Sequence, residues 1–123
     1  MITYEQGREI SLWTWRKIVR EHLRKKPFKA IDKHFKMGVP AGCGFCMWAK
    51  PKKAACSACP LSVNGMGCHP DYEQWEEWQY RYFNCFGTPY SEKTCERWME
   101  YWAKKFLAFL ESTPEHLKEE EKT

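Results

Sequence analysis

The sequence has no hydrophobic run long enough to cross a membrane and no sustained alternation of apolar and polar residues. A membrane-spanning helix needs about 20 consecutive apolar residues, and no apolar stretch of this chain approaches that length. The opening stretch, MITYEQGREISLW, also lacks the basic region followed by an apolar region of a secretory signal. We therefore expect a soluble, cytoplasmic protein, and the absence of strand-like alternation predicts a mainly α-helical fold.

The sequence also lacks the common catalytic motifs. It contains no glycine-rich phosphate loop, no Gly-x-Ser-x-Gly, no His-Glu-x-x-His and no His-x-Glu element of the zinc deaminases. A CGFC tetrapeptide begins at Cys43 and has the outline of a thiol-redox site, but such a site follows a strand, and the preceding KMGVPAG is not strand-like. We therefore predict a protein without enzymatic activity, with thiol redox chemistry as the alternative.

Cysteine is the most informative residue type that the sequence does contain. The 7 cysteines among 123 residues fall short of the ~8–10% typical of small disulfide scaffolds, and disulfides would also need an oxidising compartment. Two C-x-x-C pairs lie nine residues apart, and in a reducing compartment such pairs more often bind metal. A tetrahedral zinc ion takes four thiolates, and each C-x-x-C turn supplies two of them. The predicted zinc ligands are Cys43, Cys46, Cys56 and Cys59.

Other ligand sets remain open because the segment between the pairs is shorter than the ~15–20 residues usual in zinc ribbons. Further donors follow downstream at Cys68, His69 and Cys85. The metal could instead take one cysteine from each pair together with Cys68 and Cys85. An iron–sulfur cluster is the alternative cofactor. We prefer zinc bound by the two pairs alone, and Gly42 and Gly44 supply the backbone freedom that a metal-binding turn requires.

Two helices are predicted before the cysteine segment. Thr3 with Gln6 forms a capping box, and the helix that starts there should run to about Lys26, before Pro27. Its apolar stripe comprises Leu12, Trp15, Ile18, Val19 and Leu23. The next helix lies within PFKAIDKHFKM. There the inward residues should be Phe28, Ile31 and Phe35, and the outward residues Lys29, Lys33 and Lys36.

Two more helices are predicted after the cysteine segment. An aromatic helix should begin with Asp71 as N-cap, with Gln74 three residues later. The last helix should begin with Thr88 as N-cap and Pro89 in its first turn, and end near Ser112. Its apolar face comprises Cys95, Trp98, Trp102, Phe106 and Phe109 or Leu110, with Cys95 expected to be a buried small hydrophobe.

These elements predict one domain. Residues 1–112 should form a single helical domain with a zinc-knuckle insert at about 40–69, and residues 113–123 a charged, frayed C-terminal tail. A chain of 123 residues is large enough for one hydrophobic core, and a second core is not expected.

The charges divide the chain into a basic front and an acidic back. Residues 1–53 contain 13 Lys and Arg against 4 Asp and Glu, and residues 54–123 contain 7 against 12. This asymmetry predicts either a surface for a polyanion or attraction between the two halves of the chain. Arginines at every fourth position would form a basic ridge on one helix face. The predicted nucleic-acid-binding residues are Arg16, Arg20, Arg24, Lys25, Lys26, Lys29, Lys33, Lys36, Lys50, Lys52 and Lys53.

Two other interpretations of these surfaces stay open. Lys and Arg side chains cover many helices that bind nothing, so the basic residues could simply be solvated. The acidic, aromatic stretch DYEQWEEW, which begins at Asp71, suits a module that docks on a host or viral protein. We favour nucleic-acid binding through the phosphate backbone, with little sequence preference, because no helix of the type that reads base edges is recognisable.

Four cysteine motifs follow one another between residues 43 and 90: the first C-x-x-C pair, CSACPL from Cys56, GMGC ending at Cys68, and CFGTPY from Cys85. This order resembles a group of small cysteine-rich proteins of tailed bacteriophages. In those proteins a single late cysteine lies near the Thr-Pro, whereas here sixteen residues separate Cys68 from Cys85. The resemblance implies a phage gene product in a bacterial cytosol, and it brings no activity with it.

Overall fold

The computed structural model describes residues 2–36, 44–45, 68–84, 87 and 89–115. These residues contain the helices α1 (Tyr4–Glu21), α2 (Phe28–Phe35), α5 (Pro70–Phe83) and α6 (Glu92–Ser112). No strand occurs among them, which confirms the predicted mainly helical class. Within the same ranges, no helix is both long enough and apolar enough to span a membrane.

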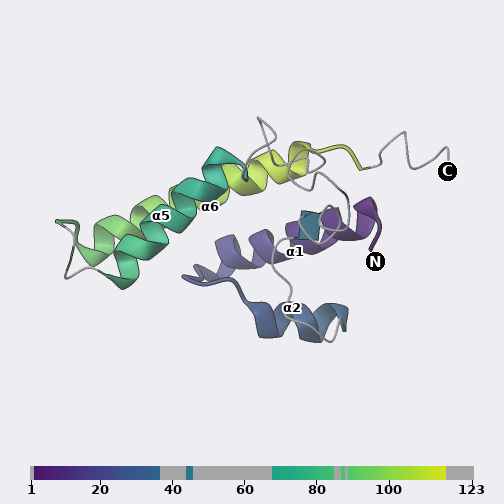
Figure 1. Cartoon of the computed structure of the whole chain (residues 1–123), viewed down its shortest axis with the longest axis horizontal. Coiled ribbons are helices and arrows are strands. Elements are labelled where there is room, and N and C mark those ends of the chain that lie inside the picture. Colours follow the sequence, from purple (N-terminus) through teal and green to yellow (C-terminus); the bar gives the residue numbers. More distant parts are fainter. Residues whose placement is uncertain (1, 37–43, 46–67, 85–86, 88, 116–123) are drawn as a thin grey trace.

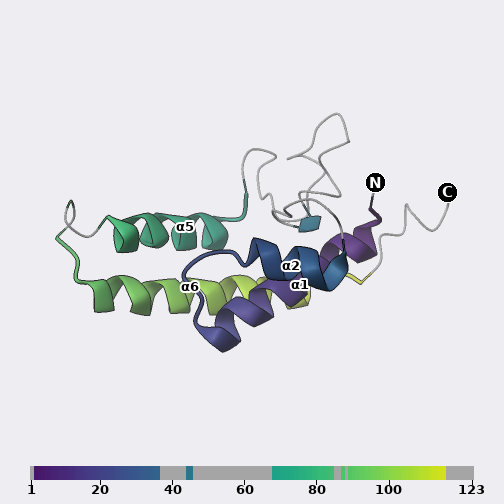
Figure 2. The ribbon, with the colours of Figure 1, turned by 90° about the horizontal axis from the view of Figure 1, so that it is seen from below.

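The helices form a hairpin with two further helices on one side of it. α5 and α6 run side by side over most of the length of α5, in opposite directions (Figures 1 and 2). α1 packs against the second half of α6, and α2 lies against α1 on the side turned away from α6 (Figure 1). α1 is therefore covered by α6 on one side and by α2 on the other.

The start of α1 is set by the predicted capping box. Thr3 Oγ1 accepts a hydrogen bond from the Gln6 N–H at 3.1 Å, and Gln6 Oε1 accepts one from the Thr3 N–H at 2.9 Å. These bonds satisfy backbone donors that have no partner inside the helix. The helix ends at Glu21, so the predicted end at Lys26 is wrong.

A left-handed C-cap ends α1, and the segment after it is bound to α5. His22 adopts a left-handed conformation with φ 54° and ψ 44°, and the Leu23 N–H donates to the Ile18 carbonyl at 3.0 Å. The Gln79 side chain of α5 then donates to the Arg24 carbonyl at 2.8 Å. The left-handed His22 thus ends the helix before Pro27, and α5 satisfies a backbone acceptor of the segment that follows.

The main core lies where α1 meets α5 and α6. The predicted stripe of α1 faces this core: Leu12, Trp15 and Ile18 are buried, and Val19 and Leu23 are partly buried against it. The Trp15 ring centroid lies 4.8 Å from that of Phe106 and 5.0 Å from that of Trp75, both nearly perpendicular. Edge-to-face aromatic pairs of this kind add about 0.5–1.5 kcal/mol each beyond area burial.

The N-caps of α5 and α6 differ from the predicted ones. His69, not Asp71, caps α5, because His69 Nδ1 accepts from the Asp71 N–H at 3.1 Å. Ser91 caps α6 through a bond from the Thr94 N–H to its Oγ at 3.1 Å. The expected cap, Thr88, lies outside the described residues. The predicted end of the last helix at Ser112 is confirmed.

The buried face of α6 is rotated from the predicted one. Trp98 is 39% exposed, so its predicted place in the core is wrong, and Trp102 and Phe109 are only partly buried. The buried positions recur at steps of four, four, three and four residues, as on one face of an α-helix. The residues of this face are Cys95, Met99, Ala103, Phe106 and Leu110. Cys95 is fully buried, as predicted.

α2 joins α1 through a second, smaller cluster. Ile31 is fully buried against Ile10, with Phe35 partly buried beside Trp13. The predicted inward position of Phe28 is wrong, since this residue is 42% exposed. The predicted outward lysines are all exposed, namely Lys29, Lys33 and Lys36.

Candidate functional site

The predicted metal ligands Cys43, Cys46, Cys56, Cys59 and Cys85 lie outside the described residues. Among the residues that are described, no group of three or more His, Cys, Asp or Glu side chains is arranged to hold a metal ion. The described residues nearest to the predicted ligands are Gly44 and Phe45, inside the first C-x-x-C pair, and the alternate ligands Cys68 and His69.

The inner residues of the first C-x-x-C pair are docked on α1. Phe45 is fully buried in the main core, with its ring 5.3 Å from that of Tyr4. Its backbone N–H donates to Ser11 Oγ at 3.2 Å. The middle of the CGFC motif is therefore part of the folded core.

Gly44 allows this docking by its small size. A Cβ atom at this position would lie 2.1 Å from the Gly7 carbonyl oxygen and 2.8 Å from Ser11 Oγ. Real Cβ atoms do not come so close to a backbone oxygen. Gly44 does not have a positive φ, so the predicted need for backbone freedom is wrong here, and close approach to α1 is the reason for glycine.

The alternate ligands Cys68 and His69 lie at the start of α5. Cys68 is half-buried and packs against the main core. His69 also packs on α6, with its ring 4.0 Å from that of Phe109. Burial lowers the pKa of His69, although the nearby carboxylates of Asp71 and Glu73 act in the opposite direction.

The capping role of His69 limits it as a metal ligand. A ring nitrogen that accepts a hydrogen bond carries no proton, so in the neutral ring the proton is on Nε2. Zinc binding through Nε2 would move that proton to Nδ1 and break the bond from the Asp71 N–H. Metal binding through Nε2 of His69 would thus cost α5 its N-cap bond.

The predicted arginine ridge does not form one free surface. Arg16 pairs with Glu111 at 3.4 Å, and Arg20 with its neighbour Glu21 at 3.2 Å. Arg24 lies beyond the end of α1, where it is only 21% exposed. It approaches two carboxylates of α6, at 3.6 Å from Glu96 and 3.8 Å from Glu100. Two of the three arginines therefore connect the basic half of the chain to the acidic half.

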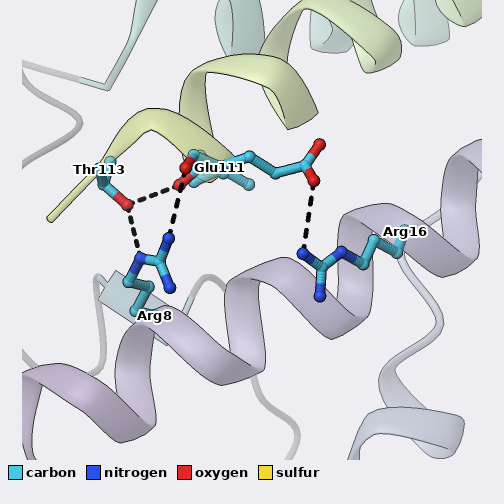
Figure 3. Close-up of polar contacts among 5 residues, drawn as sticks. Arg8, Arg16, Glu111 and Thr113 are labelled. Atoms are coloured by element: carbon cyan, nitrogen blue, oxygen red, sulfur yellow. Dashed lines mark hydrogen bonds and ion pairs between the residues drawn. The ribbon is translucent and has the colours of Figure 1, made fainter. Parts of the chain in front are cut away.

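A second link between the halves involves Arg8, which the sequence analysis did not single out. Arg8 Nε donates to Thr113 Oγ1 at 3.0 Å, and Nη2 donates to the Glu111 carbonyl at 3.4 Å (Figure 3). The hydroxyl of the fully buried Tyr4 donates to the Pro114 carbonyl at 2.7 Å. The first residues of the predicted tail are thus held against α1. No local pattern in the sequence indicates these contacts, because they join opposite ends of the chain.

The lysines behave differently from the arginines. Lys25, Lys29, Lys33 and Lys36 are exposed, and none of them takes part in an ion pair among the described residues. Lys26 is the exception, because it donates to the Tyr72 hydroxyl and lies 4.4 Å from the centre of that ring. Lys50, Lys52 and Lys53 lie outside the described residues. Among the described residues, the predicted basic residues that are exposed and have no ion pair are therefore lysines of α2, of its C-cap and of the connection before it.

No protein-family model, no curated protein and no solved structure matches the chain. What can be inferred about function accordingly comes from the chain's own residues: a docked C-x-x-C centre, arginines that pair with α6, and lysines that face solvent.

Proposed function

We propose that this protein is a small, non-enzymatic accessory protein that is stapled by zinc and binds nucleic acid through its basic first half. The carrying observation is the contrast between paired arginines and solvent-facing lysines. Lys25, Lys29, Lys33 and Lys36 have no carboxylate partner among the described residues, so their charge can act on a polyanion. A bacteriophage origin belongs to the proposal through the resemblance of the cysteine motifs.

Nucleic-acid binding of this kind depends on the phosphate backbone. Each lysine that neutralises a phosphate releases a condensed counterion, so affinity falls as salt rises. Lys29, Lys33 and Lys36 belong to α2 and its C-cap, and a lysine ammonium group that contacts a phosphate carries no information about the base. Binding should therefore be steeply salt-dependent and weakly dependent on sequence.

The zinc part of the proposal is supported by the docking of Gly44 and Phe45. Structural zinc sites contribute their binding free energy to folding. A metal bound by Cys43, Cys46, Cys56 and Cys59 would connect the rest of the cysteine segment to α1 through this anchor. When bound, the ion supplies a rigid tetrahedral crosslink. An iron–sulfur cluster on the same thiolates is the alternative cofactor.

Metal analysis of the purified protein tests the zinc part. About one zinc per chain is expected, and Cys46→Ser or Cys59→Ser should remove it. Cys68→Ser and Cys85→Ser should retain it if the two pairs close the site by themselves. Bound iron and sulfide, together with a visible absorption band, would show that the cofactor is an iron–sulfur cluster and not zinc. A protein that binds no metal when all its thiols are reduced would refute both cofactors.

Fluorescence anisotropy with short DNA and RNA tests the nucleic-acid part. The triple variant Lys29→Glu, Lys33→Glu, Lys36→Glu should lower affinity by at least tenfold and reduce the salt slope. The matched control carries the same charge change on exposed positions of α6: Lys93→Glu, Arg97→Glu, Lys104→Glu. Equal losses in both triples would mean that only net charge matters. No binding by the wild type at about 50 mM salt would refute the proposal.

A second candidate function is docking on a host or viral protein. It is favoured by an exposed aromatic row around the hairpin of α5 and α6. Trp98 stacks on Trp78 with ring centroids 5.9 Å apart, and Tyr101 meets Trp98 at 5.4 Å. Trp98 and Tyr101 are 39% and 45% exposed, and aromatic side chains of this kind are enriched in protein interfaces. A folded protein that binds no nucleic acid at low salt would favour this function.

A further inference from the structure

A pocket of about 470 Å³ lies between the connection that follows α1 and the second half of α5. Sites for small ligands occupy roughly 300–1,000 Å³, so this pocket can take a group of the size of a nucleobase. Its wall combines three aromatic rings with two lysines and one carboxylate. The residues concerned are Lys25, Lys26, Phe28, Glu76, Tyr80 and Phe83.

The aromatic rings of this pocket are open to solvent. Phe28 is 42% exposed, Phe83 48% and Tyr80 67%. A single exposed aromatic residue is ordinary in a soluble protein. Here three of them, from two separate segments, line the same concave surface. Exposed rings that share a concavity offer flat apolar faces to a planar ligand.

The charge of the pocket favours an anionic ligand. Lys25 Nζ lies over the Phe83 ring, 4.9 Å from its centre, so a cation shares this ring with any planar group that stacks on its other face. Lys26 adds a second positive charge next to the pocket, against the single carboxylate of Glu76. A phosphate would be attracted to Lys25, while the group attached to it could rest on Phe83.

The walls of the pocket are held in place by hydrogen bonds. Gln79 donates to the Arg24 carbonyl at 2.8 Å and so ties the connection after α1 to α5. Asn84 donates to the Tyr80 carbonyl at 2.8 Å and closes the end of α5. Lys26 and Tyr72 form a further bond across the same interface. The pocket therefore exists before any ligand arrives, which reduces the entropy cost of binding.

We infer that this pocket binds single-stranded nucleic acid, with an unpaired base on the ring of Phe83 and a phosphate at Lys25. The inference rests on the proposed nucleic-acid binding and assigns a specific site to it. Stacking on an aromatic side chain needs a base that is not already stacked in a duplex. Binding at this site should therefore favour single strands over duplexes, which the lysines of α2 alone would not do.

The test compares Phe83→Leu with Phe83→Trp in the full-length, metal-loaded protein. Leucine keeps an apolar side chain but removes the π-face, whereas tryptophan retains a stacking ring. Tyr101→Leu is the matched control, because Tyr101 is 45% exposed on α6 and does not line the pocket. Anisotropy is measured with labelled oligothymidine, oligouridine and a DNA hairpin duplex, and circular dichroism checks the fold of each variant.

Phe83→Leu is expected to weaken oligothymidine binding about tenfold, equivalent to about 1.4 kcal/mol, and to leave the duplex unchanged. Phe83→Trp and Tyr101→Leu should bind as the wild type does. If the wild type binds oligouridine more tightly than oligothymidine, RNA is the preferred strand. Phe83→Leu should then weaken oligouridine binding by the same factor. If Phe83→Leu binds single strands as tightly as the wild type, the pocket is refuted and the lysine-based binding stands. If the wild type binds no nucleic acid at all, both inferences fail.

Discussion

α1 packs against α6 through large, fully buried aromatic residues but against α2 through two buried isoleucines and rings that are at most partly buried. On the α6 side, Trp15 contacts the fully buried Phe106 within a large continuous cluster. On the α2 side, the described residues that are buried are Ile10 and Ile31, and Trp13 meets the rings of His34 and Phe35 at the edge of this cluster. Hydrophobic stabilisation grows with the apolar area removed from water. The structure therefore consists of a strongly packed unit of three helices and a lightly attached α2.

The charged residues follow the same division. On the α6 side, Arg16 and Arg24 pair with carboxylates of the acidic half. On the α2 side, Lys29 and Lys33 point into solvent. Arginine offers several donors in a fixed planar fork and suits such pairing better than lysine does. The basic half of the chain therefore contains two groups of residues: arginines that pair with carboxylates of the acidic half, and lysines that are exposed without an ion pair among the described residues.

The strongest test of this comparison is Phe106→Ala against Phe28→Ala. Phe106 is fully buried, so its truncation should lower the free energy of unfolding by about 3–5 kcal/mol. Phe28 is 42% exposed, and its truncation should change that free energy by less than about 0.5 kcal/mol. Urea unfolding followed by tryptophan fluorescence measures both. Similar losses in the two variants would contradict the unequal packing.

A second test concerns the anchor of the cysteine segment. Gly44→Ala places a methyl group against the Gly7 carbonyl and should cost about 3 kcal/mol, the upper end for overpacking. Gly87→Ala is the control, because a Cβ there meets no atom within 4 Å. Thermal unfolding of both variants provides the comparison. If the alanine at position 44 is tolerated as well as the one at 87, the docking on α1 is not a stabilising contact.

Ile31→Ala tests how lightly α2 is attached. The loss should be about 2 kcal/mol, at the low end for a buried isoleucine, because the small cluster can close over the space. Amide hydrogen exchange should accelerate in α2 and stay unchanged in α6. Ile18→Ala removes a side chain from the core on the α6 side of α1. This variant should accelerate amide exchange in α2 and in α6. Faster exchange in α6 of the Ile31 variant would show that the two sides are coupled.

The arginine pairs should contribute less than any of the packing contacts. Arg24→Gln removes the contacts to Glu96 and Glu100 and should lower the free energy of unfolding by at most about 1 kcal/mol, less at high salt. Lys29→Gln should leave it unchanged, since Lys29 has no ion pair among the described residues. If both substitutions lower the free energy of unfolding equally at low salt, the paired arginines do not differ from the exposed lysines in their contribution to stability.

The smallest effect expected is a pH dependence at Glu21. Hydrogen bonds from Lys17 and then Arg20 hold the pKa of this exposed carboxyl below its usual range. Its contribution to stability is thus present above the pKa of the unfolded chain and is lost as pH falls through the lower pKa of the folded state. The difference in stability between wild type and Glu21→Gln should vanish in acid. In a Lys17→Gln background it should already be reduced at neutral pH.

Several elements could be predicted because their cause is local. The capping box of Thr3 and Gln6, the outward lysines of α2 and the buried Cys95 depend on residues within a few turns of one another. The choice between neighbouring faces of α6 could not be predicted. Trp98 and Met99 are adjacent, and only the positions of α1 and α5 decide that Met99 is buried and Trp98 is exposed.

For the candidate site, the sequence by itself determined two features: two C-x-x-C pairs nine residues apart and an excess of positive charge before residue 54. Tertiary structure alone decided how individual residues of these regions contact the rest of the chain. Gly44 needs its small size because Gly7 lies opposite, and Arg24 pairs because Glu96 and Glu100 of α6 come within reach. Spacing along the chain encodes contacts within a few turns, whereas a contact between distant residues depends on how whole helices pack.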